Sequence, residues 1–315
     1  MSTATSPESI HITDVAPRDG LQNQQVRVET AFKLELIRVL SEAGVRSIEI
    51  GAFVSPKAVP QMADTAEVVR KFNEQQAGLR TSVLVPNLRG LEIAHETGAK
   101  EIAVVLSATE TMNRKNINMG LMQALDVSVA TLHAATSNGM RTRAYVAVAF
   151  ECPFEGETPV DTVVNLSRQM QDAGAQEIVI ADTIGSASPS MVKDRMRVVA
   201  EAVPVARLAV HFHDTRGMGL ANAWAALEAG VRRFDTSVGG IGGCPFAPGA
   251  AGNLATEDLV LMAERSGFHT GIRLDKLLDA IDMAERALQR PLGGRSIAWL
   301  RRQRGCLNFC VQGAA

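Results

Sequence analysis

The chain has 315 residues, of which 46% are hydrophobic and 21% are charged, and its formal net charge is −2. So much apolar side chain is enough to bury a large core, which excludes a disordered protein. Basic and acidic residues are mixed along the chain without a basic face, and no apolar run is long enough to span a membrane. We therefore expect a small-molecule partner, no nucleic-acid partner and no membrane association.

Residues 1–8 are polar and lack both an apolar signal core and arginines, so a short N-terminal tail is expected. Four cysteines in a chain of this length do not form a disulfide framework. Both features favour a reducing, cytoplasmic setting. Cys306 and Cys310 near the end fit either a redox pair or a frayed terminus. The sequence does not decide the oligomeric state, and a homo-oligomer stays open.

Short runs rich in β-branched residues alternate with helical stretches along the chain. The expected strands are Ile10–Ala16, Ser47–Ile50, Thr81–Val85, Glu101–Ser107, Arg143–Phe150, Glu177–Asp182, Ala206–His213 and Arg233–Val238. The expected helices include Glu29–Ala43, Ala63–Gln75, Leu88–Thr97, Val160–Ala173, Pro189–Ala202 and Gly219–Ala229. From about Arg273 onward the pattern predicts one or two further helices.

A helix that ends in Ala-Gly or Thr-Gly and leads into a strand recurs four times. The four glycines, typical helix-stop residues, are Gly44, Gly98, Gly174 and Gly230. Eight strands with interleaved helices predict an α/β protein with a (β/α)8 TIM barrel, which needs about 250 residues. We expect the barrel over residues 9–272 and a helical extension packed on it over 273–315. A doubly wound sheet is the alternative, but no dinucleotide fingerprint follows any strand.

Two histidines close the seventh expected strand, and a barrel places its chemistry at the strand ends. His211 and His213 lie two residues apart, so the period of a strand puts both imidazoles on one face. Such a pair can chelate a metal, whereas a single core histidine is usually structural. Asp214 is expected on the other side, where it can orient a ligand.

Acidic residues and one arginine follow other expected strands. Asp19 can supply a carboxylate oxygen to a metal, and Arg18 can hold a developing oxyanion with its fork of donors. Glu49 and Asp182 are acids at strand ends that can act as bases or orient other groups. A surface turn for Arg18 and Asp19, and structural ion pairs for the other two, are the competing interpretations.

An asparagine completes a candidate metal site. Asn253 can give its amide oxygen to the cation bound by Asp19 and the two histidines. Four such ligands leave two of six positions open, which suits Mg²⁺, Mn²⁺, Co²⁺ or Zn²⁺ and argues against a closed structural zinc. An open divalent cation can chelate a substrate and act as a Lewis acid.

The segment from Ser237 to Asn253 is rich in glycine and carries one thiol, Cys244. Glycine lets the backbone reach positive φ and approach a ligand closely. The composition fits a mobile segment that delivers Cys244 to a reaction. A slack surface connection with an incidental cysteine is the alternative.

Together these residues resemble the 3-hydroxy-3-methylglutaryl-CoA lyases, within a superfamily of metal-dependent lyases and Claisen-type synthases on TIM barrels. The resemblance covers nearly the whole chain and rests on Arg18-Asp-Gly-Leu-Gln-Asn23, Phe53-Val-Ser-Pro-Lys57, Lys115-Asn-Ile-Asn118, Cys152-Pro-Phe-Glu-Gly156, Asp182-Thr-Ile-Gly185, His211-Phe-His-Asp-Thr215 and Gly252-Asn-Leu-Ala-Thr-Glu-Asp258. The Gly-Gly-Cys-Pro loop around Cys244 is the part specific to the lyases.

The resemblance implies metal-dependent cleavage of 3-hydroxy-3-methylglutaryl-CoA to acetyl-CoA and acetoacetate, with Mg²⁺ or Mn²⁺ as the first choice of metal and leucine breakdown as the pathway. The implied metal ligands are Asp19, His211, His213 and Asn253. It further implies that Arg18 stabilises the enolate of acetyl-CoA, that Cys244 handles a proton, and that Glu49 and Asp182 support the proton transfers. An acyl-CoA is then the small-molecule partner.

Substrate identity is less certain than reaction type. Arg143 is a cation at a strand end that we expect near the acyl group, although ordinary surface charge is an equal alternative. Arg216 stands where the family usually has tyrosine, which leaves citramalyl-CoA or a longer acyl group open. A condensing enzyme of the isopropylmalate synthase type and a non-catalytic CoA-responsive protein are further alternatives. The former would carry a regulatory extension, and the latter would be expected to lose ligands or the thiol.

Overall fold

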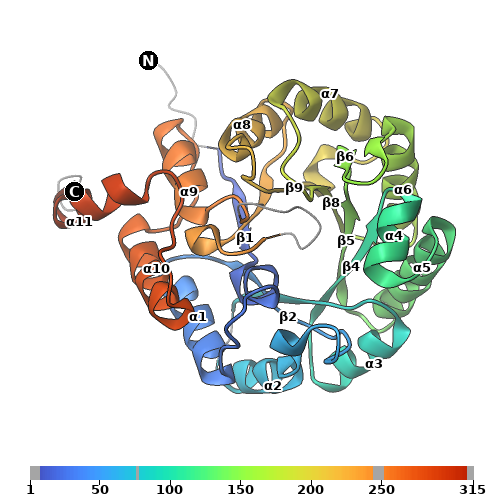
Figure 1. The fold of residues 1–315 in the computed structure, drawn as a ribbon, viewed down its shortest axis with the longest axis horizontal. Helices are drawn as coiled ribbons and strands as arrows, with labels where there is room; N and C mark the ends of the chain where they lie inside the picture. The colour runs from blue at the N-terminus through green and yellow to red at the C-terminus, as the bar shows by residue number, and fades with distance from the viewer. Residues whose placement is uncertain (1–7, 76–77, 244–251, 311–315) are drawn as a thin grey trace, which may run out of the picture.

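The computed structural model describes residues 8–75, 78–243 and 252–310. Eight parallel strands close into a barrel in the order β1-β10-β9-β8-β5-β4-β3-β2. Figure 1 looks into this barrel, with the helices in a ring around it. The barrel strands are β1 His11–Asp14, β2 Ser47–Ala52, β3 Arg80–Leu84, β4 Glu101–Ser107, β5 Arg141–Ala147, β8 Glu177–Asp182, β9 Leu208–Phe212 and β10 Arg233–Thr236.

The helices form the outer layer (Figure 1). They are α1 Thr30–Glu42, α2 Thr65–Gln75, α3 Leu88–Glu96, α4 Glu110–Ile117, α5 Leu121–Ser137, α6 Val160–Asp172, α7 Pro189–Ala200, α8 Gly219–Glu228, α9 Thr256–Arg265, α10 Leu274–Leu288 and α11 Ile297–Cys310. Helix α10 packs against α1, α9 and α11. The two helices expected beyond Arg273 are therefore present, and α10 lies against the barrel's outer ring.

The predicted (β/α)8 barrel is confirmed, and the named strands and helices match to within a few residues. The four helix-stop glycines all adopt the positive φ that the Ala-Gly pattern predicts, with Gly44 at +100° and Gly174 at +104°. Helices α4, α5 and α9 were not named from the sequence. A π-helical turn at Ala16–Gly20 and a hairpin of β6 (Glu151–Cys152) and β7 (Gly156–Glu157) were not predicted either. Both lie immediately beyond barrel strands, where no periodic pattern identifies them.

The interior of the barrel combines small apolar side chains with buried charge. Ala103, Tyr145, Val179 and Ala209 pack against one another there. All six residues of β8 are buried, as expected for a strand covered on both faces by the interior and by helices. Charged residues also sit inside, among them Arg143 and Asp235, which are 1% and 2% exposed. A charge buried in this way must be paired, and the pairs bear on the site described below.

The C-terminal segment is tied to the start of the glycine-rich segment. Gly293 donates its backbone N–H to the Gly239 carbonyl at 2.9 Å. The buried carboxylate of Glu257 accepts from the backbone N–H of Gly239 at 3.0 Å and of Gly294 at 2.7 Å. Burial is the main cause that raises the pKa of Glu257 to about 7, against the lowering effect of these backbone donors. One carboxyl group thus links two distant parts of the chain.

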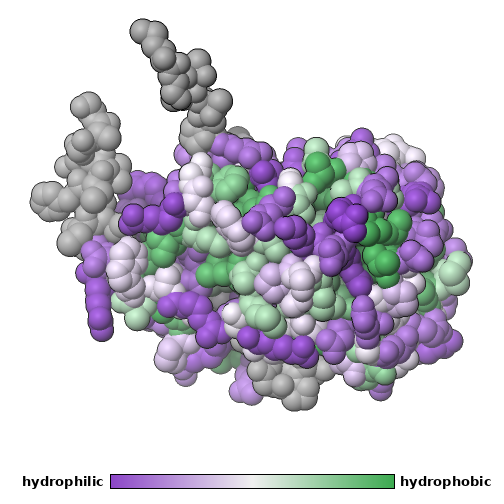
Figure 2. Space-filling view, turned by 90° about the horizontal axis from the view of Figure 1, so that it is seen from above, coloured by the Kyte–Doolittle hydropathy of each residue, from purple (hydrophilic) through white to green (hydrophobic). Residues whose placement is uncertain are grey.

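The described helices do not include one with both the length and the apolar character that crossing a membrane requires. Over the face shown in Figure 2, hydrophilic residues predominate and hydrophobic ones form scattered patches.

Replacing Glu257 with glutamine should change how stability depends on pH. The folded-state pKa of about 7 lies above the ordinary value of 4.5 for a glutamic acid, so the folded state holds the proton more tightly than the unfolded chain does. The contribution of protonated Glu257 to the stability of the fold is therefore complete below pH 4.5 and is lost as the pH rises through 7. Urea unfolding of both proteins across this pH range should show that the free energy of unfolding of the wild type falls by roughly 3 kcal/mol relative to that of Glu257→Gln. A pH-independent difference between the two would contradict this assignment.

Candidate active site

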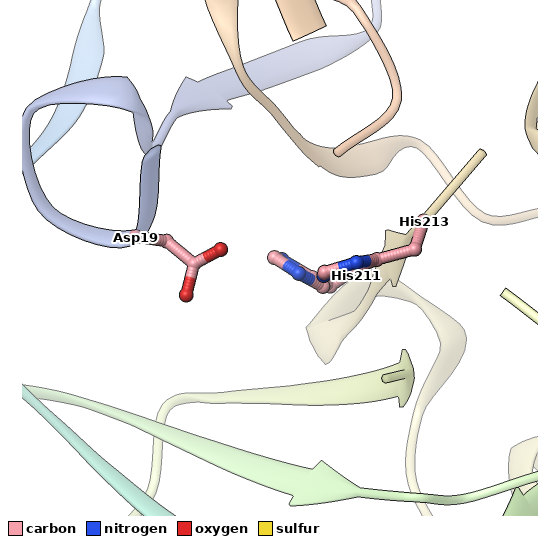
Figure 3. Close-up of side chains that lie close together, drawn as sticks. All are labelled: Asp19, His211 and His213. Atoms are coloured by element: carbon pink, nitrogen blue, oxygen red, sulfur yellow. The ribbon is translucent and has the colours of Figure 1, made fainter. Parts of the chain in front are cut away.

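Asp19, His211 and His213 converge at one end of the barrel. Figure 3 shows the Asp19 carboxylate, on the turn after β1, pointing toward the two imidazoles at the end of β9. A ligand atom from each of the three residues lies within 4.8 Å of the others. Strands β1 and β9 are both neighbours of β10 in the barrel. Residues 192 positions apart in the chain are therefore brought together by the closure of the sheet.

The strand period places the histidines as predicted. Their ring centroids are 5.2 Å apart at an interplanar angle of 47°, and both residues are buried. Phe212 between them packs instead near Phe150, with ring centroids 6.3 Å apart. Alternation along β9 thus separates two polar side chains at the mouth from an apolar one that packs in the core.

Asn253 joins the cluster, although it lies far from Asp19 in sequence. It pairs with His213 in an isolated antiparallel bridge, which fixes its backbone beside β9. Its Nδ2 donates to Asp19 Oδ2 at 2.9 Å and to the Ile241 carbonyl at 3.1 Å. All four residues expected as metal ligands are therefore grouped together.

The donor set fits a divalent cation. Two buried atoms in the group, His213 Nδ1 and Asn253 Oδ1, have no hydrogen-bond partner among the described residues. Unpaired buried polar atoms are rare in folded proteins and call for an explanation. Imidazole nitrogens with carboxylate and amide oxygens form a mixed set that first-row divalent metals accept. These residues could hold such an ion without rearrangement of the chain.

The electrostatics keep Asp19 and His213 in the forms that bind cations. Burial raises the pKa of Asp19, but the guanidinium of Arg18, the neighbouring His211 and the hydrogen bond from Asn253 outweigh it and hold this pKa below its ordinary value. Burial, with the neighbouring His211, lowers the pKa of His213 to about 4. At neutral pH Asp19 is therefore a carboxylate and His213 a neutral imidazole, the forms that bind cations.

Arg18 is held beside this group by two carboxylates. Its Nη1 donates to Asp19 Oδ1 at 2.6 Å and its Nε to Glu49 Oε2 at 2.5 Å. Burial alone would lower the pKa of Arg18, but Glu49 and Asp19 raise it above its ordinary value. Glu49 is fully buried on β2, and its Oε1 has no hydrogen-bond partner in the part of the chain that the structure describes. The guanidinium is thus charged and oriented before any ligand binds.

Asp182 ends β8, but its carboxylate is engaged by the following loop. Oδ1 accepts from the Ser186 N–H at 2.9 Å and Oδ2 from the Ala187 N–H at 3.0 Å. Burial raises its pKa, while these backbone donors oppose the shift. The contacts indicate that Asp182 fixes the shape of the loop after β8.

Arg143 lies inside the barrel and is paired with two carboxylates. It is 1% exposed, its Nε pairs with Glu177 at 2.6 Å and its Nη2 with Asp235 at 2.6 Å. That Arg143 binds substrate stays a prediction, and these two carboxylate partners do not favour it. Strand alternation predicted an inward side chain but not its depth in the barrel.

Arg216 and Asp214 lie beyond β9. Arg216 is half exposed; its Nη1 donates to the Ser186 carbonyl at 3.3 Å and lies 3.6 Å from Glu151 Oε2. Asp214 accepts from the Gly219 N–H at 2.8 Å and pairs with Arg295 at 2.9 Å. As expected, Asp214 faces away from the histidines, and its contacts serve the start of α8 and the C-terminal segment.

Cys244 lies outside the described residues, so its predicted role stays a prediction. On the near side of this gap, Asn23 Nδ2 donates to the Gly243 carbonyl at 3.0 Å. This hydrogen bond joins the turn after β1 to the start of the glycine-rich segment and does not involve the thiol.

Two residues near the metal ligands were missed by the sequence reasoning. Gln22 Nε2 donates to Asp19 Oδ1 at 3.0 Å, and its position three residues after Asp19 in a turn was the available signal. Asp235 Oδ2 lies 3.5 Å from His211 Nδ1. The available signal for Asp235 was a carboxylate within an expected barrel strand, a feature that it shares with Glu49 and Asp182.

Removal of a ligand should abolish tight metal binding. We expect His213→Ala to weaken Mn²⁺ binding, measured by electron paramagnetic resonance, by more than the roughly 10–100-fold that loss of a ligand's hydrogen-bond partner costs. The exposed His133 on α5 offers a matched control, since His133→Ala removes an imidazole far from the cluster in the fold. Equal Mn²⁺ affinity for His213→Ala and the wild type would contradict the site.

Comparison with known proteins supports the same assignment. The family model described as HMGL-like matches residues 9–284. The mitochondrial hydroxymethylglutaryl-CoA lyase of Homo sapiens is 46% identical over 289 residues, which cover 92% of this chain and 89% of that protein.

Solved structures agree with this similarity. The hydroxymethylglutaryl-CoA lyase from Pseudomonas aeruginosa has a TM-score of 0.90 and 40% identity, covering 95% of this chain and 99% of that one. An HMG-CoA lyase from Acinetobacter baumannii, in complex with coenzyme A and 3-methylmalate, has a TM-score of 0.88 and 39% identity, covering 92% and 94%. The resemblance drawn from the motifs is thereby confirmed, and the chain belongs to the HMGL-like family.

Proposed function

We propose that this protein cleaves 3-hydroxy-3-methylglutaryl-CoA to acetyl-CoA and acetoacetate in a metal-dependent retro-Claisen reaction. The observation that carries the proposal is the convergence of Asp19, His211, His213 and Asn253 beside a pre-oriented Arg18. Family membership and the names of the relatives support the same substrate. Mg²⁺ or Mn²⁺ is the preferred metal, with Co²⁺ or Zn²⁺ also compatible with the donor set.

Four residues would hold the metal: Asp19, His211, His213 and Asn253. When bound, a divalent cation supplies a Lewis acid that polarises the oxygens of the substrate. The protein contributes buried side chains, of which Asp19 is ionised and His213 neutral at working pH. The proton of the tertiary hydroxyl would pass to a base, a transfer that Glu49 and Asp182 are proposed to support. The C2–C3 bond would then break, so that C3 becomes the ketone of acetoacetate and the electron pair passes to the acetyl-CoA enolate.

Arg18 would stabilise that enolate. Its guanidinium is held by Glu49 and Asp19, so no reorganisation is needed as negative charge develops on the thioester oxygen. Glu49 acts through Arg18 and is a positioning residue in this scheme. Asp182 supports the site by shaping the loop that follows β8.

Cys244 would complete the reaction by protonating the acetyl-CoA carbanion at C2. An unperturbed thiol has a pKa of about 8.5, and a nearby cation lowers it. The support for this role is the lyase-specific Gly-Gly-Cys-Pro sequence. The proposed partner is an acyl-CoA, in line with the coenzyme A in the Acinetobacter baumannii lyase structure. Leucine breakdown and a cytoplasmic location stay predictions.

A related acyl group is the alternative, because Arg216 is a cation near the mouth of the barrel. It is half exposed and lies beside the loop after β8. Such a cation would favour a differently placed carboxylate, as in citramalyl-CoA. The condensing-enzyme alternative is not favoured by any feature of the described residues.

The first test is release of acetyl-CoA from 3-hydroxy-3-methylglutaryl-CoA, with and without Mn²⁺, beside citramalyl-CoA. We expect metal-dependent cleavage of the first substrate and a collapse of turnover in Cys244→Ala. Turnover of citramalyl-CoA alone would keep the chemistry and replace the substrate. No turnover of either compound by a folded, metal-loaded protein would contradict the proposal.

Replacing Arg18 separates its proposed role from simple binding. Arg18→Gln should lower kcat by roughly 10²–10³, since the lost interaction strengthens only as the enolate forms. Arg18→Lys is the matched control that keeps the charge but loses the fork geometry, and it should recover only part of the rate. Steady-state kinetics give the readout. A rise in KM at unchanged kcat would assign Arg18 to substrate binding instead.

A further inference from the structure

We propose that Asp235 is a positioning residue for the metal ligand His211, and that Arg143 and Tyr145 hold Asp235 in place for this purpose. The proposal rests on the metal site of the proposed function. It assigns a role to a polar group inside the barrel that the reaction scheme above does not use, and it gives Arg143 a function other than substrate binding.

The first step is the geometry between Asp235 and His211. The two residues are register partners on the adjacent strands β10 and β9, so their side chains stand side by side. His211 Nδ1 lies 3.5 Å from Asp235 Oδ2. Nδ1 is buried and has no hydrogen-bond partner closer than this carboxylate. An interaction on the Nδ1 side leaves Nε2 as the ring nitrogen available to a cation.

The second step is the pair of hydrogen bonds that hold the Asp235 carboxylate. Arg143 Nη2 donates to Asp235 Oδ1 at 2.6 Å, and the Tyr145 hydroxyl donates to Asp235 Oδ2 at 2.5 Å. All three residues are at most 4% exposed. The carboxylate is therefore fixed by one donor on each oxygen, and it cannot turn away from His211 without breaking a buried hydrogen bond.

The third step is a contact that joins the support directly to the ligand. The Tyr145 ring meets the His211 ring edge-on, with centroids 6.1 Å apart and an interplanar angle of 80°. Tyr145 thus touches His211 with its ring and Asp235 with its hydroxyl. This arrangement restricts the imidazole from two sides, through a carboxylate at Nδ1 and an aromatic edge.

A merely structural role explains less of this arrangement. Arg143 already has a carboxylate partner in Glu177, at 2.6 Å from its Nε. Burying a second carboxylate beside it adds a desolvation cost. Metal-binding histidines commonly donate their other N–H to a carboxylate, which fixes ring orientation and tautomer. Asp235 has the position and the partners for that task.

The experiment measures Mn²⁺ affinity by electron paramagnetic resonance, with folding followed by circular dichroism. Asp235→Asn should weaken Mn²⁺ binding roughly 10–100-fold, the usual effect of losing a ligand's supporting group. Tyr145→Phe removes only a hydroxyl and should weaken it by a smaller factor, about two- to tenfold. Glu177→Gln is the matched control: it disturbs the other partner of Arg143 and should leave the Mn²⁺ Kd within about twofold of wild type.

The wild type distinguishes this inference from the proposed function. If wild-type protein does not bind Mn²⁺, the metal site itself is wrong, and the role of Asp235 falls with it. If the wild type binds Mn²⁺ while folded Asp235→Asn keeps the same Kd, only the positioning role is overturned. Should Asp235→Asn fail to fold, a wild-type Kd in Tyr145→Phe overturns it equally. If Glu177→Gln weakened Mn²⁺ binding as much as Asp235→Asn does, the loss would be explained by general destabilisation, and this result would also contradict the positioning role.

Discussion

The buried guanidinium of Arg18, held between Glu49 and Asp19, is the interaction on which the candidate site depends. It ties the turn after β1 to β2 and orients the first metal ligand at the same time. Removing one member of a buried pair of this kind costs about 3–5 kcal/mol, because the charge left behind is stranded. The geometry of Asp19 is therefore enforced by the same contacts that keep Arg18 charged and directed at the site.

The rest of the site follows from the closure of the barrel around this pair. Strand β10 lies between β1 and β9, so it brings Asp19 close to the two histidines. It also carries Asp235, the register partner of His211. Asn253 arrives by its bridge to His213. His213 Nδ1 and Asn253 Oδ1 have no hydrogen-bond partner among the described residues, and a bound cation would satisfy them. The buried Arg18 and Arg143 are each paired with carboxylates, as burial of a charge requires.

Much of this arrangement was predictable from particular residues. The two-residue spacing of His211 and His213 fixed their common face, and the Ala-Gly connections predicted the barrel. The depth of Arg143 in the barrel could not be predicted. Alternation indicates that its side chain points inward, but not that Glu177 and Asp235 pair with it there. Asp182 was correctly placed at a strand end, yet its loop contacts are not visible in a sequence. Asp235 was missed because its partners come from other strands, which only the closed sheet brings near.

The most direct test is anomalous diffraction from crystals of this protein grown with Mn²⁺. We expect one strong anomalous peak within bonding distance of Asp19, His211, His213 and Asn253, with the guanidinium of Arg18 still paired to Glu49. A peak elsewhere, or clear density with no peak at this position under saturating Mn²⁺, would contradict the proposal that these four residues form the metal centre.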